Sequence, residues 1–193
     1  LTVTLVGTDE LPLPSMPRSA RLQAAQLLSE RGIFWYGRAR AAQVNQGSLM
    51  LAGRQPLNFD ACIIATGSSA SPWLRKSGLA TNADGYIEVT PTLQSISHSN
   101  VFAAGDVAAY THPRPKSGVY AVRAGPVLAN NLRAYCEDRV LRSWIPQSRA
   151  LYILNIGDRN ALATRGNFSW SGRWPWIWKD HIDRQFVARF AST

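Results

Sequence analysis

Asp106 is the residue of this sequence whose surroundings point most directly to a chemical role. It lies in the stretch NVFAAGDVAAY, residues 100–110, where every neighbour except the two end residues is small or apolar. Aspartate is disfavoured within strands, and an isolated ionised carboxylate is costly to bury. Asp106 is therefore expected either to cap a turn or the following segment, or to face a ligand that offers it hydroxyl or amide donors.

The cysteines and histidines form no pattern that predicts metal binding or redox catalysis. Cys62 and Cys136 are far apart and belong to no CxxC or CxxxxC pair, and His98, His112 and His181 are isolated. A disulfide framework, a structural zinc site and a disulfide-reductase mechanism are therefore unsupported, and no side chain is a convincing general acid or base. This cysteine usage is typical of a reducing cytoplasm.

Composition indicates a globular, basic chain. The 193 residues are 46% hydrophobic and 17% charged, and no apolar run reaches the roughly 18 residues of a membrane-spanning helix. The opening residues LTVTLVG have no initiator methionine and no signal-peptide features, so we expect a chain cut from something longer. The net charge of +9 favours anionic partners such as phosphates, nucleic acid or lipid headgroups, or else serves only solubility.

The first third of the chain has the element order of an α/β nucleotide-binding unit. The patterns predict a strand over 1–7, a helix over 18–32 that stops at a glycine, two strands over 33–44 and 48–53, and a strand covered on both faces over 59–67. Strands that alternate with a helix favour a parallel sheet.

The middle of the chain predicts a second buried strand and a long helix. Residues 68–99 are rich in turns, and the buried strand falls within 100–110. An exposed loop over 111–118 leads into a helix of small residues over 119–137, which Pro126 should kink or break.

The C-terminal segment combines tryptophans with basic residues. Residues 167–190 hold four of the seven tryptophans, and Ile182, Phe186 and Phe190 follow Ile177 at helical spacing, so we expect an amphipathic helix there.

The buried strand ending in ATG (65–67), the later VFAAGD (101–106) and the small-residue helix together resemble the FAD-dependent pyridine nucleotide-disulfide oxidoreductase superfamily. The similarity is greatest to its type II NADH dehydrogenase branch, including relatives linked to selenide, water dikinase, and it extends over nearly the whole chain. It implies an α/β, Rossmann-like, three-layer FAD/NAD(P)-binding fold that is truncated at the N-terminus. The implied parts are the rest of a nicotinamide-binding half (1–67), the C-terminal part of an FAD-binding domain (68–140) and a C-terminal interface segment (141–193).

The resemblance assigns Asp106 to the ribityl chain of FAD. In the family this carboxylate accepts a hydrogen bond from a ribityl hydroxyl, and Gly105 lets the backbone approach the ligand closely. The alternative is that Asp106 only caps the turn. Thr66 and Gly67 match the family's crossover between its nucleotide domains, close to the cofactor, or else form a plain turn from strand to loop.

The same resemblance places the start of the long helix at the pyrimidine edge of the flavin. The backbone N–H groups of Gly118, Val119 and Tyr120 would lie there, with Lys116 beside them, where a helix N-terminus stabilises negative charge. The alternative is an ordinary helix start after a proline-containing loop.

The departures from the family pattern concern the nucleotide phosphates and the ribose. The chain has no GxGxxG loop, so taken alone it should bind FAD weakly or not at all, and pairing with another chain or domain swapping could cover its open edges. The strand over 1–7 resembles the second strand of the nicotinamide half, where the family often has a ribose-binding acid. This sequence has Gly7 and Thr8 there, with Asp9 and Glu10 later, so selection of NADH is open.

The resemblance implies an oxidoreductase that moves a hydride from NAD(P)H to FAD, and electrons then to an acceptor, with quinone, a selenium compound and oxygen all open. A non-catalytic interaction module and a basic membrane- or nucleic-acid-binding protein are the alternatives. The aromatic C-terminal segment would pack on the FAD domain or a homodimer partner, or lie on a membrane; stacking of nucleic-acid bases is the least favoured reading. The expected location is the cytoplasm, with or without peripheral contact at the inner face of the membrane.

Overall fold

The computed structural model describes residues 1–67 and 69–191, and its contacts divide the chain into two compact units. One unit joins Leu1–Ile64 to the segment from Arg149 onward, and the other is Ala65–Ser148. The sequence-based division instead placed boundaries at residue 68, which lies outside the described residues, and at residue 141, and it kept 141–193 as a separate segment. In the structure the part from Arg149 onward joins the N-terminal part, because a sheet formed there packs against an N-terminal helix.

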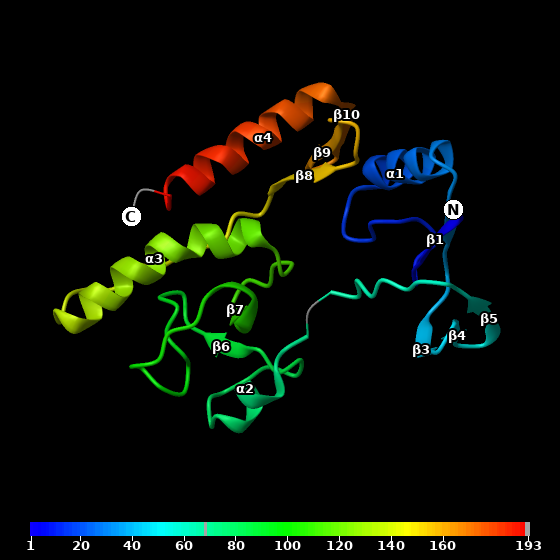
Figure 1. The fold of residues 1–193 in the computed structure, drawn as a ribbon. Helices are drawn as coiled ribbons and strands as arrows, with labels where there is room; N and C mark the ends of the chain where they lie inside the picture. The colour runs from blue at the N-terminus through cyan, green and yellow to red at the C-terminus, as the bar shows by residue number, and fades with distance from the viewer. Residues whose placement is uncertain (68, 192–193) are drawn as a thin grey trace. The chain divides into compact units, whose positions relative to one another are not determined.

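The first unit begins with the predicted strand–helix–strand order. Strand β1 (Val3–Val6) pairs in parallel with β2 (Ile33–Tyr36), and α1 (Arg18–Glu30) connects them, as a parallel pair requires. The register Val6↔Tyr36 brings the carboxyl ends of both strands to one edge. Figure 1 shows β1 and α1 of this unit.

Three short strands follow as an antiparallel meander: β3 (Ala41–Asn45), β4 (Ser48–Leu51) and β5 (Arg54–Asn58). The prediction of a strand covered on both faces over 59–67 was wrong. This segment has no regular structure, and Ile63 is 93% exposed. An apolar run becomes a buried strand only beside partner strands, and within the described residues nothing pairs with this one.

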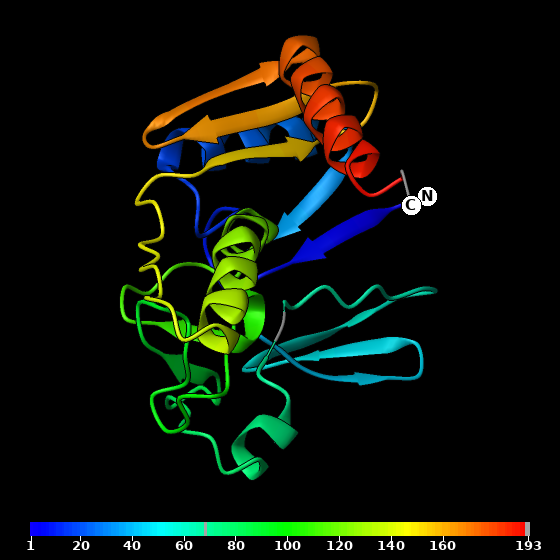
Figure 2. The ribbon, with the colours of Figure 1, turned by 90° about the vertical axis from the view of Figure 1, so that its left-hand side faces the viewer.

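A second sheet of the first unit was not predicted. Strands β8 (Leu151–Asn155), β9 (Ala161–Arg165) and β10 (Phe168–Gly172) form an antiparallel sheet in the order β10-β9-β8. Successive residues of a strand face opposite sides, and all of Ala161–Thr164 is buried, so both faces are covered. Helix α1 packs on one face and α4 (Arg173–Ala188) on the other, which makes a three-layer sandwich (Figure 2).

The second unit is built around a two-stranded parallel sheet. Its strands are β6 (Ile87–Val89) and β7 (Ala108–Tyr110), and it also contains α2 (Pro72–Lys76), the 3₁₀ turn η1 (Gly105–Val107) and α3 (Gly118–Cys136). Its core residues are Leu74, Ile87, Val89, Ala103 and Ala108.

One expectation for this unit needs correction. Within 100–110 only Ala108–Tyr110 forms a strand, so Asp106 lies in the turn before the strand and not at its end. Helix α3 runs through Pro126 as one element, so of the two expected effects of this proline the break is absent and the kink stays a prediction. None of the described helices combines the length and hydropathy that crossing a bilayer requires.

Candidate functional site

Gly105 forms the tight turn that leads to Asp106. Its φ of +72° is a left-handed conformation that glycine adopts without steric cost, and a Cβ there would lie 3.4 Å from the Cβ of Ala121. The Gly105 N–H donates a hydrogen bond of 2.7 Å to the phenol oxygen of Tyr110. The backbone at this turn is therefore fixed from two sides, by Tyr110 and by helix α3.

Asp106 is exposed on this turn. No hydrogen bond or ion pair joins its carboxylate to any residue that the structure describes, and η1 has no side-chain cap. The oxygens of Asp106 therefore remain available to a ligand.

The hydroxyl of Tyr110 supports this turn, and the sequence did not indicate that role. Its ring meets Trp144 edge to face at a centroid distance of 4.8 Å, and it is half-buried. Burial raises the pKa of Tyr110, and the charge of Asp106 raises it further, while the hydrogen bond from Gly105 works against them. The phenol therefore stays neutral and acts as a hydrogen-bonding support. The only feature of the sequence that pointed to this support was the position of Tyr110, five residues after Gly105.

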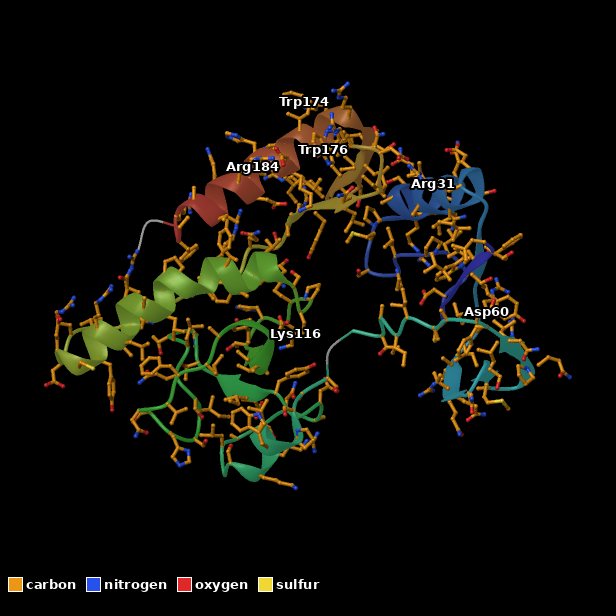
Figure 3. The ribbon with its side chains drawn as sticks, viewed as in Figure 1. Arg31, Asp60, Lys116, Trp174, Trp176 and Arg184 are labelled. Atoms are coloured by element: carbon orange, nitrogen blue, oxygen red, sulfur yellow. The ribbon has the colours of Figure 1, made fainter. Side chains whose placement is uncertain are left out.

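Lys116 lies close to the same turn (Figure 3). Its Nζ donates to the carbonyl oxygen of Ala108 and stands 3.9 Å from the ring centroid of Tyr86. Burial lowers the pKa of Lys116, whereas the charges of Asp106 and Asp84 raise it. The ammonium group is thus held near Asp106 by the start of β7 and an aromatic ring.

The start of α3 has N–H donors at Gly118 and Val119, whereas the third donor expected there, the N–H of Tyr120, bonds to the Ser117 carbonyl oxygen. The N-cap Ser117 makes no capping bond, its Oγ is buried and has no partner among the described residues, and the first turn contains no acid. The Ser117 carbonyl oxygen accepts hydrogen bonds from the N–H groups of Tyr120 and Ala121, at 3.1 and 3.3 Å. The N–H groups of Gly118 and Val119 have no partner within the helix, because the first turn of a helix cannot supply one.

The structure brings together five of the seven predicted site residues. Helix α3 packs against η1, so Gly105, Asp106, Lys116, Gly118 and Val119 belong to one region. Thr66 and Gly67 are exposed and irregular, and no hydrogen bond within the described parts of the chain connects them to that region.

The donors and acceptors of this region fit a polyol and an electron-poor ring. A free carboxylate beside a glycine with φ > 0 suits hydroxyl groups, and an uncapped helix start with an orphaned serine hydroxyl suits carbonyl or ring nitrogen acceptors. These are the groups of FAD. A nearby cavity of about 200 Å³, lined by Tyr110, His112 and Trp144 among others, is smaller than the roughly 300 Å³ at which ligand pockets start.

Comparison with known proteins gives one family and several similar folds. The family model described as pyridine nucleotide-disulphide oxidoreductase matches residues 1–125. The sulfide:quinone oxidoreductase of the hyperthermophilic bacterium Aquifex aeolicus is 14% identical with a TM-score of 0.79, over 97% of this chain and 49% of that one.

Two further structures are similar over most of this chain. An NAD-dependent persulfide reductase from A. fulgidus is 20% identical with a TM-score of 0.69, over 86% of this chain and 31% of its own. An FAD-dependent pyridine nucleotide-disulphide oxidoreductase from Desulfovibrio vulgaris is 19% identical with a TM-score of 0.66, over 84% of this chain and 42% of its own. At these identities the likeness establishes the fold, and this chain spans half of those proteins or less.

Proposed function

Because this chain belongs to the pyridine nucleotide-disulphide oxidoreductase family, we propose that it is the part of an FAD-dependent NAD(P)H oxidoreductase that holds the polyol and ring of the flavin. The observation that carries the proposal is the free carboxylate of Asp106 on a left-handed glycine turn beside the uncapped start of α3. FAD, when bound, supplies the hydride and electron chemistry.

The residues of this chain bind and orient the cofactor. Asp106 accepts hydrogen bonds from ribityl hydroxyls, and a charged acceptor makes such bonds about twice as strong as neutral ones. The N–H groups of Gly118 and Val119 and the ammonium of Lys116 favour negative charge on the ring system. Thr66 and Gly67 retain their proposed place at the crossover between nucleotide domains.

The finer assignment to the type II NADH dehydrogenase-like branch, with a small-molecule acceptor such as quinone, is also a proposal. It is supported by exposed aromatic and aliphatic side chains on α4, among them Trp174, Ile177 and Trp178, next to basic residues. Such a helix suits peripheral contact with the inner face of a membrane or a homodimer contact.

A second candidate is a non-catalytic interaction module with the same architecture. Binding of flavin through Asp106 separates the two candidates.

The proposal is tested by titrating the 193-residue chain with FAD up to millimolar concentration, because a chain without a GxGxxG loop is expected to bind FAD weakly, and by recording flavin fluorescence and absorbance. We expect Asp106→Asn to weaken FAD binding about tenfold, as loss of one charge-assisted hydrogen bond implies. The matched control is Asp60→Asn, which removes one charge from another exposed aspartate (Figure 3) and should leave FAD binding unchanged. Equal FAD affinity for the wild type and Asp106→Asn would overturn the proposal.

A further inference from the structure

Tyr86 contacts the lysine of the candidate flavin site, and the flavin proposal gives it no role. Its N–H donates to the Oδ1 of Asn82 at 2.9 Å, and its carbonyl oxygen accepts from the Asn82 N–H, also at 2.9 Å. The residue after it, Ile87, is 4% exposed and starts β6. A closed turn on one side and a buried strand on the other therefore fix the backbone that carries the Tyr86 ring.

The ring of Tyr86 lies against the ammonium group of Lys116. The Nζ of Lys116 stands 3.9 Å from the ring centroid, and it also donates to the carbonyl oxygen of Ala108, the first residue of β7. A cation over an aromatic face is attracted by the ring, and the attraction is stronger when the pair is desolvated. Both side chains belong to half-buried residues, so the ring and the Ala108 carbonyl together hold the ammonium in place.

The carboxylate of Asp106 is within electrostatic reach of this ammonium. Burial lowers the pKa of Lys116, while the charge of Asp106 and then that of Asp84 raise it. Yet within the described residues no hydrogen bond or ion pair joins Lys116 to either acid, and its Nζ is engaged by Ala108 and Tyr86 instead. The stem of a lysine is flexible and its ammonium has three donors. An ammonium that nothing held would therefore pair with Asp106 and occupy its oxygens.

We propose that Tyr86 is a positioning residue that keeps the ammonium of Lys116 away from Asp106, so that this carboxylate stays free for the ribityl hydroxyls of FAD. A ring is suited to this task, because it holds a cation without neutralising its charge. Lys116 thus keeps its positive charge for the flavin ring while Asp106 keeps its acceptors for the polyol. The inference rests on the proposed function, because it concerns the same carboxylate.

The first test is a double-mutant cycle with FAD titrated into the 193-residue chain up to millimolar concentration. We expect Tyr86→Leu to weaken FAD binding by about tenfold, as loss of the Asp106 acceptor does, because Lys116 then pairs with Asp106. In a Lys116→Met background the same Tyr86→Leu change should leave the FAD affinity unaltered, since no ammonium remains to be held. A role of Tyr86 in packing alone would give the same loss in both backgrounds.

Two variants serve as controls. Tyr86→Phe keeps the aromatic face and should bind FAD within about twofold of the wild type. Tyr36→Leu removes another ring that lies beneath a cation, with the guanidinium carbon of Arg54 at 5.3 Å from its centroid, and it should leave FAD binding unchanged. Tyr86→Met repeats the cycle with a different non-aromatic side chain should Tyr86→Leu fail to fold.

The second test needs no flavin. The pKa of Lys116 is measured by NMR in the chain without FAD, with Lys116→Met identifying its signal among those of Lys76 and Lys179. Asp106→Asn should lower the pKa of Lys116 more in the Tyr86→Leu chain than in the wild type, because a directly paired carboxylate raises the pKa of a lysine more than a separated one.

The outcomes separate this inference from the flavin proposal. Equal FAD affinity for the wild type and Tyr86→Leu, or the same loss with and without Lys116, would overturn the inference. A chain that binds FAD through Asp106 but shows neither effect of Tyr86→Leu overturns this inference alone. A chain that binds no FAD, yet couples Lys116 more strongly to Asp106 after Tyr86→Leu, overturns the flavin proposal and leaves the positioning of Lys116 standing.

Discussion

The N–H of Gly105 donates to the phenol oxygen of Tyr110 over 2.7 Å, so the turn that presents Asp106 rests on a side chain from the strand that follows it. Tyr110 is itself fixed by Trp144. The position of the candidate cofactor-binding carboxylate therefore depends on a contact between residues that sequence patterns do not connect.

Tyr110→Phe should destabilise the second unit and weaken FAD binding together. Loss of the acceptor leaves the part-buried Gly105 N–H without its partner, which costs about 0.5–1.5 kcal/mol. Urea unfolding and FAD titration measure the two effects. Tyr135→Phe is the control, because its ring stays edge to face with Phe102 while only an exposed hydroxyl is lost. A Tyr110→Phe chain as stable as the wild type would contradict the role given to this bond.

Asn131→Ala should be strongly destabilising. Asn131 is fully buried on α3; its Nδ2 donates to the carbonyl oxygens of Thr92 and Arg142, and its Oδ1 accepts from the Arg142 N–H. Its removal leaves three backbone groups unsatisfied, so we expect a loss of about 3 kcal/mol in the free energy of unfolding. The exposed neighbour variant Asn130→Ala should change it by less than about 0.5 kcal/mol. Similar losses for both variants would rule out this account.

The stability of the protein should depend on Lys116 at alkaline pH. Burial lowers the pKa of Lys116 in the folded chain, so between that pKa and the unfolded value of about 10.4 the unfolded chain binds more protons. By linkage, the cost of holding Lys116 charged in the folded chain is fully present below the folded pKa and is relieved as the pH rises through this window, so stability increases there. Urea unfolding between pH 8 and 11 should show this rise in the wild type and its loss in Lys116→Met. Parallel pH profiles for the two proteins would refute the prediction.

Leu162→Ala should show that β9 is the core of the first unit. Leu162 is 1% exposed between α1 and α4, and truncation of such a leucine costs about 2–5 kcal/mol through lost burial and a residual cavity. Leu22→Ala removes the same atoms from the exposed surface of α1 and should cost less than about 1 kcal/mol. Thermal and urea unfolding compare the two variants, and a larger effect of Leu22→Ala would show that the β8–β10 sandwich is not the core.

The sequence alone predicted the features that depend on residues close together in the chain. Helical spacing and a stop at Gly32 predicted α1, and the strands around it followed from β-branched and aromatic runs. The VFAAGD stretch and the small-residue helix indicated the family and its fold, which the family match confirms.

Tertiary structure decided the features that depend on partners distant in the chain. Residues 59–67 and the strand β9 are both short apolar segments, yet only β9 has a strand on each side and a helix on each face, so only β9 is buried. The same dependence moved Asp106 from a predicted strand end into a turn, because regular pairing with β6 starts only at Ala108. The apolar composition of a segment determines how much its burial can stabilise the fold, but pairing with neighbouring strands determines which segment becomes buried.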